Sequence, residues 1–132
     1  MYICPMNIKH DRSKVLKKGI ELFWNEGYSN LGVDAICKYT GMTKGAFYNA
    51  FKSKENFLLS CLESYKTINV EYLKELLKED ERSAVNRILG MYIHMLEALP
   101  NQNFAGCMMN NMMSEVGSLN NKVAKITEQS FN

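Results

Sequence analysis

The sequence predicts an all-α protein, with three helices at its N-terminal end followed by a helical body. Along most of the chain, apolar residues recur every three or four positions, which is the spacing of one helix face. No segment shows the alternation of apolar and polar residues that a half-buried strand requires. Glycines, prolines and capping side chains divide the periodic segments into pieces of helical length.

The composition is that of a globular domain, with 132 residues of which 46% are hydrophobic and 23% charged. No apolar run reaches the roughly 18 residues that span a bilayer, and the N-terminus lacks the apolar core of a signal peptide. We therefore expect a cytoplasmic protein without a membrane segment. The four cysteines (Cys4, Cys37, Cys61 and Cys107) are too irregularly spaced to indicate a zinc site or a disulfide framework, and we expect no cofactor.

Positive charge is concentrated in the first part of the chain. Residues 1–54 carry nine Lys and Arg against four Asp and Glu, a net charge of +5. Residues 55–132 carry seven against ten, a net charge of −3. This distribution favours contact between the basic part and a polyanion. Chance unevenness on a solvated surface would give the same split.

The first helix is expected to begin between Asp11 and Ser13 and to end at Glu26. Gly27 suits the position that follows the last helical residue, because glycine adopts a left-handed conformation without strain. The ten residues before this helix lack periodicity, and Pro5 argues against an early helix. We expect these residues to form an irregular arm.

Gly19 lies within the first helix, on the apolar face that also carries Leu16, Ile20 and Phe23. A glycine inside a helix costs about 1 kcal/mol relative to alanine. We therefore expect another helix to approach closely at Gly19.

Two short helices are expected next, over Val33–Tyr39 and Lys44–Ala50, with a glycine turn between them. Thr43 is a suitable N-cap for the second, because its hydroxyl can accept a hydrogen bond from an unpaired amide of the first turn. Phe47 and Phe51 lie one turn apart and are the expected core anchors.

The remaining elements are also expected to be helices, each bounded by a capping residue or a breaker. They are predicted over Lys54–Lys78 after the cap Ser53, from the cap Ser83 to Pro100, over Phe104–Val116 before Gly117, and beyond Asn120 or Asn121, where Val123 and Ile126 share a face. Apolar stripes run along the fourth and fifth helices.

Residues 33–54 meet the requirements of a helix-turn-helix unit. Ile36 and Cys37 supply inward apolar side chains, Gly41 tolerates the positive φ of the turn, and Met42 can fill the angle between the helices. Phe47 can anchor the second helix while its outer face stays free to enter a DNA major groove. Each feature is weak alone, but together they favour DNA binding.

Two segments, VLKKGIELFWNEGY and VDAICKYTGMTKGAFYNAFKSKENFL, resemble the N-terminal domain of tetracycline-repressor (TetR) transcription regulators over about residues 12–64. The resemblance implies a helix-turn-helix DNA-binding head in residues 1–53 and a helical regulatory or ligand-binding body in residues 54–132. It also implies a homodimeric repressor that a small-molecule inducer releases from a palindromic DNA operator. The two long C-terminal helices that build the family's dimer interface are expected to be missing, so the body would be incomplete.

The resemblance also assigns residues to DNA. In the family, the position of Tyr48 contacts a phosphate, Asn49 matches a position that faces the groove, and Lys54 matches a lysine that contacts the DNA backbone. The asparagine amide could read adenine through two hydrogen bonds. A packing role for Tyr48 and a solvated Asn49 are the alternatives. The full set of expected DNA contacts is Thr43, Lys44, Gly45, Ala46, Tyr48, Asn49 and Lys54. Gly32 departs from the threonine or serine found in many members, so it is not expected to contact phosphate.

The predicted sixth helix is rich in methionine. Soft sulfur ligands suit Cu(I), but its apolar residues form one continuous helical face, which favours core packing or the lining of an inducer pocket. Cys107 lies off this face and is expected to be structural, with a redox role as the alternative. The candidate inducer-binding residues are Tyr65, Tyr92, His94, Met109, Met112 and Met113.

Other classes of function have less support. His94 and Glu97 alone do not complete a metal site, and no protease, esterase or nucleotide-binding motif is present, so an enzyme is not expected. A helical protein–protein interaction module without DNA binding is the main alternative.

Overall fold

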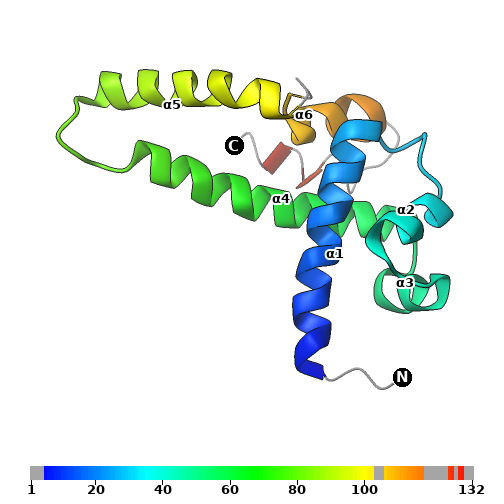
Figure 1. The fold of residues 1–132 in the computed structure, drawn as a ribbon. Coiled ribbons are helices and arrows are strands. Elements are labelled where there is room, and N and C mark those ends of the chain that lie inside the picture. Colours follow the sequence, from blue (N-terminus) through cyan, green and yellow to red (C-terminus); the bar gives the residue numbers. More distant parts are fainter. Residues whose placement is uncertain (1–4, 103–105, 118–124, 127, 130–132) are drawn as a thin grey trace.

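The computed structural model describes residues 5–102, 106–117, 125–126 and 128–129, and no strand occurs among them. The all-α prediction is confirmed. The elements are α1 (Pro5–Glu26), α2 (Val33–Thr40), α3 (Lys44–Phe51), α4 (Lys54–Leu77), α5 (Ala84–Ala98), a 3₁₀ turn η1 (Leu99–Gln102), α6 (Met108–Met112) and a π-helical turn η2 (Met113–Gly117). Helices α2 and α3 lie beside the start of α4, while α5 returns along α4 from its far end (Figure 1).

Helix α1 begins earlier than the sequence predicted. It starts at Pro5 instead of between Asp11 and Ser13, so the expectation of an irregular arm over the first ten residues is wrong from Pro5 onward. Proline is compatible with the first turn of a helix, because the amide that it lacks would have no partner within the helix there.

Helices α1 and α4 form the most extensive contact between elements, and Gly19 permits it. A Cβ atom at Gly19 would lie 2.5 Å from Cζ of Phe57 and 2.6 Å from Sγ of Cys61, closer than real Cβ atoms approach other atoms. The predicted close approach of another helix is confirmed, and this helix is α4.

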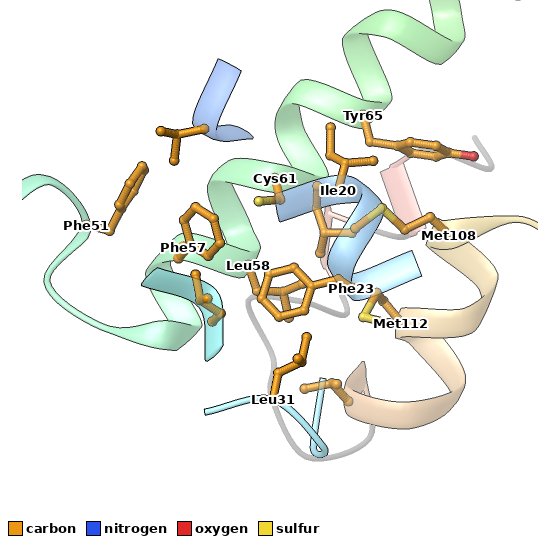
Figure 2. Packing of buried hydrophobic residues seen from close by; sticks show 14 of the residues in the cluster. Ile20, Phe23, Leu31, Phe51, Phe57, Leu58, Cys61, Tyr65, Met108 and Met112 are labelled. Atoms are coloured by element: carbon orange, nitrogen blue, oxygen red, sulfur yellow. The ribbon is translucent and has the colours of Figure 1, made fainter. Parts of the chain in front are cut away.

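The core of the N-terminal part is a cluster of phenylalanines around Phe57 of α4. Its ring centroid lies 5.7 Å from that of Phe23, 5.3 Å from Phe47 and 4.7 Å from Phe51. Phe57 therefore joins α1 and α3 to α4, and the predicted anchor role of Phe47 and Phe51 is confirmed, since both are buried. Figure 2 shows this cluster continuing through Leu58 and Cys61 towards α6.

The C-terminal elements differ from the prediction at their boundaries. Gly106 has a positive φ of 76° and Cys107 is an extended N-cap, so α6 begins at Met108 rather than at Phe104. After Met112 the chain widens into the π-helical turn, and the side chain of Met113 is 39% exposed. The predicted face is therefore not buried throughout, although Met108, Met109, Met112 and Val116 are buried. Most of the predicted seventh helix lies outside the described residues.

Helix α5 forms where its apolar stripe predicted, but none of its residues is buried against the described part of the chain. Leu96 is 64% exposed and Val85 is 66% exposed. The contact with α4 thus covers only part of the apolar surface of α5. No helix of the described residues is both long and apolar enough to cross a membrane.

Candidate nucleic-acid interface

The turn between α2 and α3 has the geometry that the sequence predicted. Gly41 adopts a left-handed conformation with φ 79°, and its amide donates to the carbonyl of Cys37 at 2.9 Å. The amide of Met42 donates to the same carbonyl at 3.1 Å, and the Met42 side chain packs against the core. The Thr43 hydroxyl then caps α3 by accepting a hydrogen bond from the amide of Ala46 at 3.1 Å.

Helix α3 has one buried and one free face. Phe47 and Phe51 anchor it, whereas the five predicted contact positions along the helix are all exposed; they are Lys44, Gly45, Ala46, Tyr48 and Asn49. The Tyr48 side chain is 46% exposed, with its ring edge-on to Phe47 at 5.5 Å. No atom lies within 4 Å of a Cβ built on Gly45, so internal packing does not require a glycine there.

Lys44, the first residue of α3, forms an ion pair with Asp34 of α2. Its Nζ lies 2.6 Å from Oδ1 of Asp34, and both side chains are exposed. The hydrogen bond to Asp34, followed by its negative charge, raises the pKa of Lys44. This ion pair could not be predicted from the sequence, because a contact between residues ten positions apart on two helices depends on the angle of the turn.

Lys54, the first residue of α4, is only half-buried, and its ammonium group lies over the ring of Tyr28, 3.9 Å from the centroid. Burial lowers the pKa of Lys54, while the negative charge of Glu115 acts in the opposite direction. Ser53 caps α4, as predicted, by accepting from the amide of Asn56 at 3.0 Å. The helix therefore presents a charged lysine beside its own N-terminus.

Lys52, between α3 and α4, is the one non-glycine residue with a positive φ (72°) in the described chain. Its amide donates to the carbonyl of Tyr48, and its Nζ donates to the carbonyl of Asn49 at 3.1 Å. Lysine gives no sequence signal for this conformation, so the positive φ could not be predicted from the sequence. The residue closes α3 and sets the direction in which α4 starts.

A cavity of about 680 Å³ lies between α1, α4 and α5 and extends to the segment before α6. Most of its lining consists of aromatic and aliphatic side chains, among them Trp24, Tyr65 and Tyr92. The polar side chains in the lining include Lys17, Glu21 and Asn69. Burial raises the pKa of the Tyr65 hydroxyl, and the neighbouring Cys107 acts in the same direction.

The cavity brings together only two of the candidate inducer-binding residues, Tyr65 and Tyr92. The ring of His94 lies on the exposed surface of α5, 5.7 Å from Tyr72. Met109 and Met112 are buried in the core, and Met113 is exposed; these three do not line the cavity. Trp24 was not predicted as a site residue, yet its Nε1 donates to the carbonyl of Gly106 at 2.9 Å and its ring lines the cavity.

Comparison with known proteins identifies the family. Residues 15–61 match the sequence model described as bacterial regulatory proteins, tetR family. The chain is 31% identical over 107 residues to the transcriptional regulator AcuR of Cereibacter sphaeroides, covering 80% of this chain and 48% of AcuR. It is also 31% identical over 113 residues to the transcriptional repressor NemR of Escherichia coli K12, covering 84% of this chain and 57% of NemR.

Solved structures agree with these matches. The crystal structure of the reduced form of E. coli NemR superimposes with a TM-score of 0.81 at 28% identity, covering 92% of this chain and 63% of that chain. A regulatory protein TetR from Rhodobacter sphaeroides superimposes with a TM-score of 0.82 at 26% identity, over 91% and 64% of the two chains. The chain spans about half the length of the curated relatives it matches. On its helix-turn-helix geometry, its sequence and its fold, this chain belongs to the TetR family of bacterial regulatory proteins.

Proposed function

We propose that the chain is a DNA-binding transcriptional regulator, acting as a repressor that a small molecule releases from its operator. The observation that carries this proposal is the division of α3 into two faces. Buried phenylalanines fix the helix to the core, while its exposed face offers a lysine, a tyrosine, an asparagine and a glycine that packing does not require. This arrangement lets a short helix enter a major groove without unfolding.

Each exposed residue has a proposed role. Thr43, Lys44, Gly45 and Ala46 bring the start of α3 close to the DNA backbone. The Tyr48 hydroxyl donates to a phosphate oxygen, and the Asn49 amide reads adenine N6 and N7. Lys54 contributes a phosphate contact at the N-terminus of α4, where its charge adds to the unpaired amides of the helix. In this proposal Asn49 alone reads the base sequence, and the other contacts position the protein on the DNA backbone.

Regulation is proposed to act through the cavity between α1, α4 and α5. Its lining of aromatic and aliphatic groups with a few polar ones suits a small amphipathic ligand. Helix α4 begins beside the DNA-binding surface at Lys54 and lines the cavity with Tyr65 and Ile68. A ligand that favours a different placement of α4 shifts the population away from the DNA-binding geometry. The candidate ligand contacts are Tyr65 and Tyr92, because His94 and the three methionines (Met109, Met112 and Met113) do not line the cavity.

The proposed partner is a near-palindromic operator read by a homodimer in the cytoplasm, since a two-fold symmetric pair places two recognition helices in successive major grooves. The known relatives carry the names of regulators and repressors, not of enzymes. A second candidate, a helical interaction module, rests on the exposed apolar face of α5. The salt dependence of binding distinguishes these two candidate functions, because phosphate contacts make DNA affinity fall steeply as the salt concentration rises.

Selection from a pool of random-sequence duplexes tests the DNA proposal. The wild-type chain is expected to enrich a defined motif, an inverted repeat if it binds as a dimer. Asn49→Ala is expected to enrich a pool with a relaxed base preference at one position, since a bidentate base contact supplies about 1–3 kcal/mol of discrimination. Tyr48→Phe, the matched control, is expected to keep the motif and bind all duplexes more weakly. Absence of any enriched motif, together with salt-independent binding, would contradict the proposal.

A further inference from the structure

Glu115, in the π-helical turn η2, reaches across the fold to the connector between α1 and α2. The amide of Tyr28 donates to its Oε1 and Oε2 at 3.0 and 3.1 Å, and the amide of Ser29 donates to Oε1 at 2.8 Å. These donors lie 87 and 86 residues away along the chain. One carboxylate from the body therefore satisfies two backbone amides of the DNA-binding head.

The connector is shaped to receive this carboxylate. Gly27 ends α1 in a left-handed conformation with φ 78°, and the following two amides turn toward a common point. Successive amides after such a turn form a concave anion-binding site. A Cβ at Gly27 would lie 3.0 Å from Oε2 of Glu115, so the glycine also provides room for the carboxylate.

Lys54 extends the contact to the start of α4. Its ammonium lies over the ring of Tyr28, whose amide Glu115 binds, and its charge acts on Glu115. Burial alone raises the pKa of Glu115, but the hydrogen bonds from Ser29 and Tyr28 and the charge of Lys54 outweigh it, so the pKa lies below its usual range. The carboxylate is thus held in the charged form that binds the amides.

We propose that Glu115 is a positioning residue that ties the body to the DNA-binding head, holding the α1–α2 connector and Lys54 in the geometry that DNA requires. The proposal rests on the function proposed above and adds a second link between the body and the head beside α4. This link also reaches the cavity, because Gly106 and Cys107 line it and lead directly into α6 and η2. A ligand in the cavity that displaced Cys107 would therefore also displace Glu115.

Amide hydrogen exchange of the 132-residue chain tests the link directly. In Glu115→Ala, the amides of Tyr28 and Ser29 are expected to exchange at least about tenfold faster, while amides of the α3 core keep their protection. Glu115→Gln, which retains an accepting oxygen, is expected to restore part of the protection. Glu97→Ala removes the same charge and side chain from the exposed surface of α5 and serves as the control. Unchanged exchange at Tyr28 and Ser29 would overturn the proposal.

DNA affinity provides the functional readout, measured on the duplex enriched by the wild-type chain. Glu115→Ala is expected to weaken binding by about fivefold or more. In the double variant with Lys54→Ala, the fold-loss of DNA affinity is expected to be smaller than the product of the two single fold-losses, because the two residues act through one unit. Binding by Glu115→Ala as tight as wild type would overturn the coupling. If the wild-type chain bound no DNA, the function itself would fail, and the exchange experiment would still decide the link.

Discussion

At the scale of single residues, the ion pair between Lys44 and Asp34 places a negative charge beside the start of the recognition helix. Because both side chains are exposed, the pair contributes little to stability. Asp34→Asn is therefore expected to leave the unfolding free energy nearly unchanged. It frees Lys44 for phosphate and removes a repulsive charge, so DNA binding at low salt should tighten by about two- to fivefold.

Affinity measured at two salt concentrations, together with thermal unfolding, checks this expectation. Glu71→Gln is the matched control, since it breaks an exposed ion pair with Lys74 in the far half of α4. At physiological salt the DNA affinity of this control should stay near that of wild type, because exposed charges are screened there over roughly 8 Å. Equal or weaker binding by the Asp34 variant would contradict the prediction.

The residues predicted correctly from sequence are those whose chemistry is local. Thr43 and Ser53 cap the helices that follow them, and Ser83 caps α5 by accepting from the amide of Asn86 at 3.2 Å. Side-chain capping depends on residue type and a spacing of three, both visible in a sequence. The contact of Glu115 with the α1–α2 connector was not predicted, because its partners lie far away along the chain and no residue pattern marks such a contact.

At the scale of the elements, Phe57 connects three helices through one side chain. Truncation to alanine leaves a cavity between α1, α3 and α4, and such changes cost about 3–5 kcal/mol. Phe57→Ala is expected to lower the urea midpoint strongly, since small domains are stable by only about 5–15 kcal/mol. Leu77→Ala, at the partly exposed end of the same helix, should cost less than about 1 kcal/mol. Similar losses in the two variants would show that Phe57 does not organise the core.

Helix boundaries followed from sequence where a breaker stands at the end, and not elsewhere. Glycines ended α1 and α2 as predicted, because their positive φ closes a helix. Pro5 begins α1 rather than preventing a helix, since proline breaks the interior of a helix but suits its first turn. Helix α6 begins later than predicted, because Gly106 has a positive φ and Cys107 is extended, and neither conformation followed from the apolar periodicity. The stripe of α5 predicted a helix correctly, but periodicity does not specify what covers a helix.

At the scale of the whole molecule, the cavity is expected to govern DNA binding from a distance. Ala98, the last residue of α5, lines the cavity, and Ala98→Trp places a bulky ring there in place of a ligand. If ligand binding shifts α4 and α6 away from the DNA-binding arrangement, this variant should bind the enriched duplex about fivefold or more weakly. Ala84→Trp, at the exposed opposite end of α5, is the matched control and should bind like wild type. Because Trp24 also emits, the emission of the new ring is read as the difference between the variant and wild type, and a blue shift in that difference would show that the new ring is buried. Full DNA affinity with a buried ring would contradict the regulatory role of the cavity, whereas weakening in both variants would point to a general effect on α5.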